Sequence, residues 1–238
     1  MAASGRQAGS GPTSTQRGRG LGPTAALCII TLALVCLLSA TGQGPVLAPI
    51  SGIIAAIATG LQAGLFALAY VLGAIGLGRL PAAFLARELP SRLWVQAALG
   101  IALMLYLSHL LGCFGLLSGE SLFPRVVAWG VVAIGIGLLT HQLPGGDFAR
   151  DRWPTLPWLA LLGAPALAVL FVAAANAPGW LWQSEFGAYD ALSYHLQLPK
   201  EWAAGNRLAP VDHNVYSYLP GYIEAAYLHL AQMTVGGG

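Results

Sequence analysis

The sequence predicts an all-α membrane protein: a polytopic transmembrane helix bundle with five complete spans, a short amphipathic surface helix in an outer loop, and the start of a sixth span. Of the 238 residues, 56% are hydrophobic and only 8% are charged, whereas charged residues make up about 25% of a typical soluble domain. The mean hydropathy is +0.68. The apolar residues also gather in long runs, as helices in a bilayer require. The chain is therefore predicted to be embedded in a membrane.

The first segment, residues 1–22, is rich in Gly, Ser and Thr and carries Arg6, Arg17 and Arg19. It has almost nothing to bury, so we expect a disordered basic tail. If this tail is cytoplasmic, alternate loops must be cytoplasmic too. Those loops contain Arg79, Arg87 and Arg92 and then Arg150 and Arg152, as the excess of positive charge on the cytoplasmic side requires.

A five-helix transmembrane region is predicted for residues 23–177. A span needs roughly 20 apolar residues to cross about 30 Å of hydrocarbon. The second of the five segments is overlong and has Pro49 near its start, so it is expected to tilt or kink. The predicted spans are Pro23–Thr41, Leu47–Leu77, Leu93–Leu117, Val126–Thr140 and Leu156–Ala177.

Composition also limits the partners of the chain. The net charge is only +2, and the basic residues are scattered between apolar runs, so nucleic acid is not an expected partner, whereas membrane lipid is. The three cysteines all lie inside apolar runs and form no CxxC pair. We therefore expect them to be packing thiols and not a zinc site or a disulfide framework.

Residues 178–220 are predicted to form an extracytoplasmic loop, because five crossings from a cytoplasmic N-terminus end outside. The segment from Glu185 to Glu224 holds five of the nine acidic residues of the chain. Carboxylates beside a bilayer are costly and commonly functional. This loop is therefore the candidate active site.

Within this loop, apolar spacing from Tyr189 to Trp202 predicts a short amphipathic helix on the membrane surface, which Pro199 should end or kink. Asp190 lies at its first turn, where a carboxylate either caps the helix or acts in catalysis; the spacing favours neither role. Tyr194 shares the face of Asp190, and His195 lies one step round.

Other polar residues of the loop have plausible binding roles. Lys200 and Arg207 are its only cations and could pair with a phosphate, although contact with lipid headgroups is the simpler role for Lys200. His213 follows Asp212 in a pattern that could help Asp190 to hold a divalent cation. Glu224 begins the next apolar segment, where a charge needs a partner or a function.

The loop resembles the first outer loop of bacterial multi-span glycosyltransferases of the GT-C class, relatives of dolichyl-phosphate-mannose protein mannosyltransferases and of lipid A aminoarabinose transferase. The residues that carry the resemblance are Tyr189–Leu196, Pro199–Lys200, His213–Gly221 and Glu224. Asp190 matches the loop acid of that class, and a second carboxylate would come from Glu185, Asp212 or Glu224.

The resemblance implies a bacterial inner-membrane enzyme that takes a sugar from a polyprenyl-phosphate donor and passes it to an acceptor outside the cytoplasm. The acceptor is unknown, and so is any requirement for a metal. The residues expected to act in catalysis are Asp190 and Glu224. Those expected to bind substrate are Tyr189, Tyr194, His195, Lys200, Arg207, His213 and Asn214.

Two alternatives remain open: a transporter or flippase for a lipid-linked substrate, and a non-catalytic membrane assembly subunit. The apolar pattern resumes at residues 221–238 and stops at Gly238, too soon to complete a span. We therefore expect the sequence to be the N-terminal portion of a longer protein and to be inactive alone.

Overall fold

The computed structural model describes residues 22–40, 48–85, 92–141, 157–175 and 191–234. All of its regular secondary structure within those ranges is helical, as the sequence predicts. The α-helices are α1 (Pro23–Ala40), α2 (Ala48–Leu77), α3 (Arg79–Leu85), α4 (Arg92–Cys113), α5 (Leu122–Thr140), α6 (Ala164–Ala175), α7 (Gln197–Ala204) and α8 (Tyr222–Met233). The described ranges also contain three short helices: the 3-10 helices η1 (Trp158–Gly163) and η3 (Val215–Tyr218) and the π-helix η2 (Ala191–His195).

Four helical stretches in the described part of the chain are long and apolar enough to cross a membrane. They are Ser51–Leu85, Trp94–Cys113, Leu122–Thr140 and Trp158–Ala175. The segment predicted as the first span forms a shorter apolar helix over Pro23–Ser39. The membrane character of the chain is therefore supported, while the predicted set of five complete spans is not confirmed.

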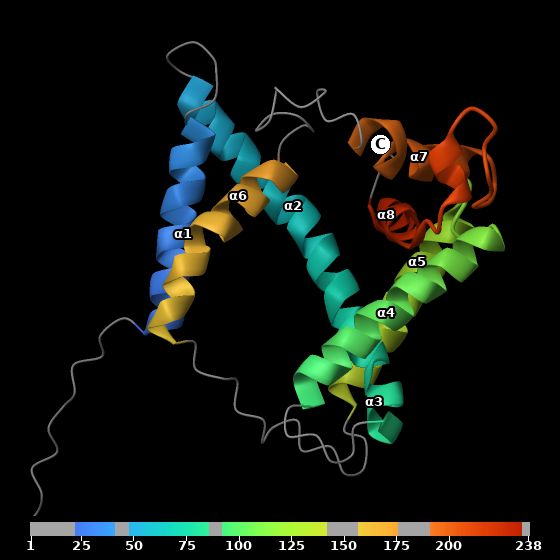
Figure 1. Ribbon diagram of the computed structural model, residues 1–238, viewed down its shortest axis with the longest axis horizontal. Helices are drawn as coiled ribbons and strands as arrows, with labels where there is room; N and C mark the ends of the chain where they lie inside the picture. The colour runs from blue at the N-terminus through green and yellow to red at the C-terminus, as the bar shows by residue number, and fades with distance from the viewer. Residues whose placement is uncertain (1–21, 41–47, 86–91, 142–156, 176–190, 235–238) are drawn as a thin grey trace, which may run out of the picture.

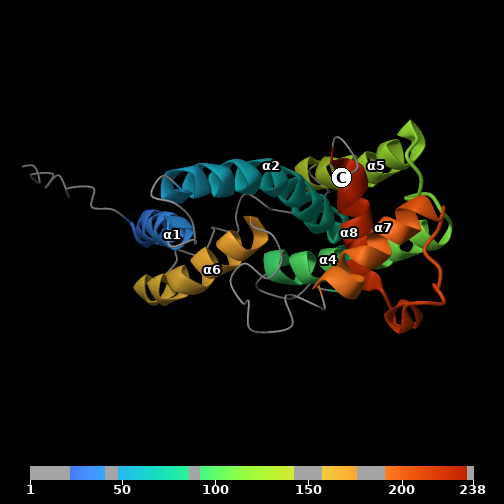
Figure 2. The same cartoon turned by 90° about the horizontal axis from the view of Figure 1, so that it is seen from above.

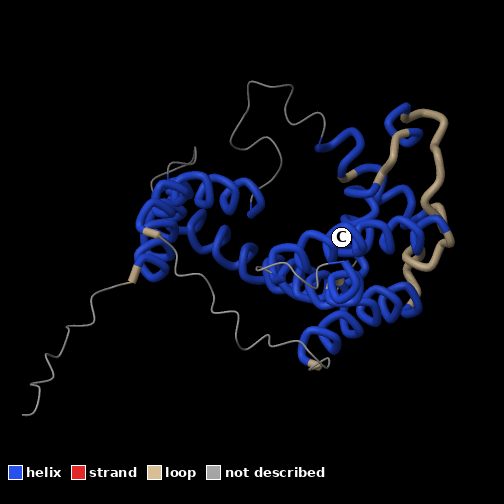
Figure 3. Tube along the Cα trace, turned by 60° about the horizontal axis from the view of Figure 1, so that its bottom comes forward, coloured by secondary structure: helices blue, strands red, loops and turns tan. Residues whose placement is uncertain are grey.

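Helix α2 connects the two ends of the molecule. Its N-terminal part lies beside α1 and α6, and its C-terminal part packs against α4 and α5, as Figure 1 shows. Figure 2 gives the same arrangement from above, with α7 and α8 at the α4–α5 end. The described part of the candidate loop, residues 191–220, therefore lies at one end of the molecule, and α1 and α6 lie at the other (Figure 3).

Close packing of α2 depends on glycines that leave room for a neighbouring backbone. A Cβ atom on Gly76 or on Gly135 would collide with the backbone of the facing helix, at Gly135 and Gly73 respectively. Gly78 and Gly100 make the same kind of contact between α2 and α4. In a bilayer, where lipid tails are as apolar as leucine, such close van der Waals contact is a main source of helix association.

Arg79 is separated from α2 only by Gly78, where the sequence predicts a loop, but it begins α3 and is only 7% exposed. Its Nη1 atom donates to three carbonyl oxygens at the end of α5, at Leu138 (2.7 Å), Leu139 (2.9 Å) and His141 (2.7 Å). The last carbonyls of a helix have no partner within the helix and bear partial negative charge. Arg79 therefore caps α5.

A buried hydrogen-bonded chain joins four helices. Tyr70 Oη on α2 lies 3.1 Å from Ser108 Oγ on α4, which lies 2.9 Å from Nδ1 of His229 on α8. His229 Nε2 donates to the carbonyl of Ala128 on α5 at 3.0 Å. Because that carbonyl can only accept, the neutral imidazole carries its proton on Nε2, and Nδ1 can only accept. The single hydroxyl proton of Ser108 is therefore shared between His229 Nδ1 and the Met104 carbonyl, which lies 2.8 Å away.

Helix α8 runs across the bundle: it is seen nearly end-on in Figure 1, whereas α2, α4 and α5 are seen from the side. It has 12 residues, or about 18 Å at 1.5 Å per residue. Its buried positions include Glu224, His229 and Gln232 as well as apolar residues. The predicted start of a sixth span is not confirmed, and α8 positions these polar groups beside α4, α5 and α7.

We predict that Gly76→Ala destabilises the protein by about 1–3 kcal/mol, the usual cost of overpacking. Gly130→Ala is the matched control, because a Cβ there meets nothing within 4 Å and alanine favours helix. Reversible unfolding in mixed detergent and SDS micelles measures both. Equal stability of the two variants would contradict the close α2–α5 contact.

We also predict that Ser108→Ala destabilises the protein by about 1–3 kcal/mol, because Tyr70 and His229 then lose a buried partner. Thr140→Ala is the control, since the Thr140 hydroxyl is exposed and bonds only within its own helix. The same unfolding assay compares them. A loss of unfolding free energy for Ser108→Ala no larger than that for Thr140→Ala would show that the buried hydrogen bonds of Ser108 do not stabilise the fold.

Candidate functional site

The described part of the loop is anchored by Trp202 on α7. Its side chain is 2% exposed, and its indole Nε1 donates to the carbonyl of Ala209 at 2.8 Å. Gly221 lies under the ring, where a Cβ atom would approach the indole to 3.0 Å. This contact packs α7 against the start of α8 and fixes the loop on the bundle.

The predicted Tyr189–Trp202 helix differs from the structure in where it breaks. Its described residues form two pieces, η2 and α7, with the interruption at Leu196. Pro199 was expected to end or kink the helix, but it lies in the first turn of α7 and is buried there. A first-turn residue needs no N–H donor, so proline is tolerated at that position.

A histidine and a carboxylate meet where η2 touches α8. His195 Nδ1 lies 2.6 Å from Glu224 Oε1, and the side chains are 37% and 10% exposed respectively. A carboxylate only accepts, so the neutral imidazole donates from Nδ1 and keeps the lone pair of Nε2 free to take a proton. Glu224 lies in the first turn of α8, where the helix dipole favours a negative charge. The pair has the geometry of an oriented general base.

Aromatic rings lead from this pair to the adjoining loop. The Tyr194 ring lies 4.1 Å from that of His195 and 4.3 Å from that of Tyr216, measured between ring centroids. The two tyrosines are stacked, with 23° between their planes. Asn214 fixes the loop by donating from Nδ2 to the Ser193 carbonyl at 2.7 Å and accepting at Oδ1 from the Tyr216 amide.

Beside the stacked tyrosines is a pocket of about 300 Å³. One wall comes from η2 and α7 and the other from the segment that enters η3. Its lining residues are Ser193, Gln197, Glu201, His213, Asn214, Val215 and Tyr216. The pocket therefore has polar and apolar walls in similar measure, and Tyr216, through its stack on Tyr194, connects it to the His195–Glu224 pair.

Glu201 is the only carboxylate among those lining residues. Its Oε1 atom accepts from Gln197 Nε2 at 2.6 Å and from His213 Nε2 at 3.1 Å. Burial alone would raise its pKa, but the hydrogen bonds from Gln197 and His213 and the positive charge that His213 can carry together lower the pKa below its usual value. Glu201 is therefore ionised at neutral pH.

The structure brings together five of the residues that the sequence assigned to the site. Glu224 contacts His195, which lies against Tyr194, while His213 and Asn214 line the pocket. Asp190 and Tyr189, together with Glu185, lie outside the described residues. The proposed role of Asp190 thus stays a prediction.

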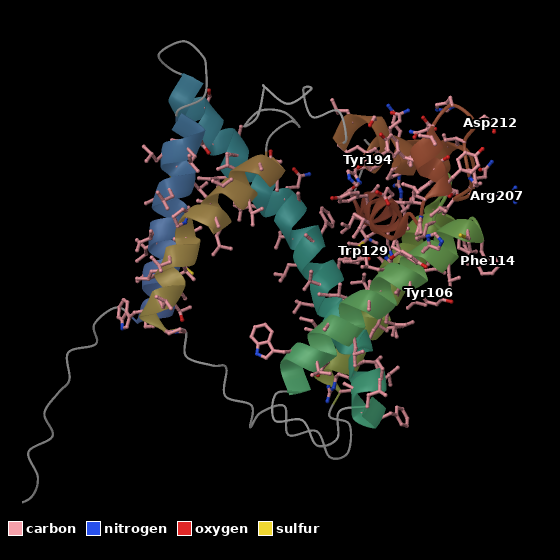
Figure 4. The ribbon with its side chains drawn as sticks, in the orientation of Figure 1. Tyr106, Phe114, Trp129, Tyr194, Arg207 and Asp212 are labelled. Carbon is pink, nitrogen blue, oxygen red and sulfur yellow. The ribbon has the colours of Figure 1, made fainter. Side chains whose placement is uncertain are left out.

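The two cations of the loop lie outside the pocket. Lys200 and Arg207 are exposed, and neither lines the pocket. Figure 4 shows Arg207 on the outer side of the loop, away from Tyr194. Within the described residues, no three His, Cys, Asp or Glu side chains come together as a set of metal ligands.

Sequence reasoning missed the other polar side chains of the pocket: Ser193, Gln197 and Glu201. These three residues recur every four positions, which places them on one face of a helix. Gln197 and Glu201 are also a favourable i, i+4 pair. That spacing was visible in the sequence, but the approach of His213 from twelve residues further on was not.

The lowered pKa of Glu201 predicts a pH-dependent stability. A depressed carboxyl pKa stabilises the folded state above 4.5, the ordinary glutamate value, and this stabilisation is lost as the pH falls through the lower folded-state value. The melting temperature of Glu201→Gln should therefore lie below that of the wild type by a few degrees at neutral pH and approach it on acidification. Exposed Glu120, replaced by Gln, is the control; a pH-independent gap for Glu201→Gln would contradict the assignment.

Comparisons with known proteins do not identify the chain. No protein-family model matches it, and no curated protein or solved structure matches it either. Its function is therefore inferred from the contacts of the site and from the apolar helices that carry it.

Proposed function

We propose that this chain is a membrane glycosyltransferase, or the N-terminal portion of one, that moves a sugar from a polyprenyl-phosphate donor to an acceptor on the extracytoplasmic side. The observation that carries the proposal is the His195–Glu224 pair, joined at 2.6 Å, beside a pocket of about 300 Å³. The order of spans, with a cytoplasmic N-terminus and residues 178–220 outside, is part of the same proposal.

The chemistry follows from the orientation of the imidazole. In glycosyl transfer the bond between the sugar's anomeric carbon and the phosphate oxygen breaks, and the bond to the acceptor oxygen forms. The phosphate leaves with the electron pair, and His195 Nε2 takes the acceptor proton. Glu224 then stabilises the imidazolium through Nδ1, as a carboxylate does for an oriented histidine base.

The surroundings suit a lipid-linked donor. The four membrane-length helices provide the apolar environment that a polyprenyl chain needs, and the packing of α7 and α8 on that bundle places the pair next to it. Tyr194 and Tyr216 offer aromatic surface for sugar rings. Asp190 supplies a second carboxylate in this proposal and orients the acceptor or a bound cation.

The test uses membranes from cells whose own gene carries each substitution, so that the protein keeps its natural length. With a radiolabelled polyprenyl-phosphate hexose as donor, His195→Ala and Glu224→Gln should each lower transfer about 100-fold or more, the usual contribution of a general base. Asp190→Asn should also abolish transfer. Glu120→Gln, which removes an exposed carboxylate outside the loop, should leave transfer unchanged.

Undiminished transfer in the His195 and Glu224 variants, with protein levels equal to wild type, would overturn the catalytic assignment. Movement of the labelled lipid across the bilayer without any glycosyl product would instead establish the transporter alternative. Tolerance of Asp190→Asn together with a stoichiometric partner in detergent pull-downs would favour the assembly subunit.

A further inference from the structure

We infer that the pocket of about 300 Å³ beside the stacked tyrosines, which Glu201 lines, binds the neutral, hydroxyl-rich ring of a single pyranose. Glu201 and Ser193 recognise the hydroxyl groups of that ring. The inference deepens the proposed function and rests on it for the reaction that the bound sugar enters. It assigns the sugar to a specific cavity and excludes the phosphate from that cavity.

Two polar atoms of the pocket walls have no hydrogen-bond partner within the described structure. They are Oε2 of Glu201 and Oγ of Ser193, and both atoms are buried. Leaving a buried, ionised carboxylate oxygen without a hydrogen-bond donor costs more free energy of folding than leaving a neutral group unpaired in the same position. Both residues line the same cavity, so a ligand that carries hydroxyl groups satisfies both atoms when the two side chains turn toward it.

The polarity of the walls defines what the ligand must offer. The free Glu201 oxygen can only accept, while the Ser193 hydroxyl can accept or donate. A ligand rich in hydroxyl donors therefore fits, whereas a phosphate would bring its own negative charge against an ionised Glu201. Lys200 and Arg207, the cations that could hold a phosphate, do not line this cavity. His213 does line it, but His213 is already bonded to Glu201.

The size and the aromatic wall narrow the ligand class further. Small-molecule sites range over about 300–1,000 Å³, and a pocket of about 300 Å³ lies at the lower end, which suits one sugar ring better than an oligosaccharide or a lipid chain. Tyr216 is held in place by its stack on Tyr194, and a fixed aromatic ring offers the apolar face of a pyranose a contact surface.

Glu201 is also held in a fixed orientation before any ligand arrives. Gln197 and His213 both donate to Oε1, which leaves Oε2 without a donor in the described structure. A ligand hydroxyl therefore has to turn a carboxylate that is already ordered and does not have to order a mobile side chain.

The experiment measures binding without turnover, with the full chain in lipid nanodiscs. Methyl β-D-glucopyranoside and methyl α-D-mannopyranoside are titrated, and saturation transfer from protein to sugar is followed by NMR. At least one should bind saturably, and Glu201→Gln should weaken it about tenfold or more, as loss of a charge-assisted hydrogen bond implies. Ser193→Ala should weaken it less, while Glu120→Gln should have no effect.

Absence of saturable binding by both glycosides, equal binding by wild type and the two pocket variants, or displacement of the sugar by excess inorganic phosphate would each overturn the inference. The near-ultraviolet circular dichroism of each variant reports folding, and if Glu201→Gln fails to fold, Ser193→Ala decides. Binding without any transferase activity would end the proposed function alone, and transfer with an unchanged KM in Glu201→Gln would end this inference alone.

Discussion

The hydrogen-bonded chain from Tyr70 through Ser108 and His229 to the Ala128 carbonyl is the constraint on which the site depends. It joins α2, α4, α8 and α5 at one point inside the bundle. Without a partner for each of these groups, burying the imidazole of His229 among apolar helices would be costly. These hydrogen bonds therefore fix α8 across the bundle. As a result, Glu224, on the first turn of α8, lies against His195.

Close contact between the helices keeps the members of this hydrogen-bonded group within bonding distance. Because association within lipid gains little from hydrophobic burial, it relies on small residues and on satisfied polar groups. The glycine contacts of α2 with α4 and α5 supply the first, and Arg79, bonded to the last carbonyls of α5, supplies the second. The helices can thus approach closely enough for short side chains such as Ser108 to reach their neighbours.

The proposed site divides its functions between two neighbouring regions. The His195–Glu224 pair offers a free imidazole nitrogen for proton transfer, and the pocket beside it offers oriented polar groups for recognition. The stacked Tyr194 and Tyr216 rings connect them. Substitutions can therefore separate the two functions, since Glu201 and His195 lie in different hydrogen-bonded groups.

The sequence by itself determined the helical class of the protein and its apolar segments long enough to cross a membrane, because hydrophobic run length is a local property that needs no knowledge of packing. It also singled out the segment that contains His195, His213, Asn214 and Glu224. Only the tertiary structure decided that Glu224 meets His195, that His213 meets Glu201, and that Arg79 caps α5 instead of remaining in a loop. Those contacts join residues from 12 to 62 positions apart, and such pairings depend on how helices pack, which no local pattern specifies.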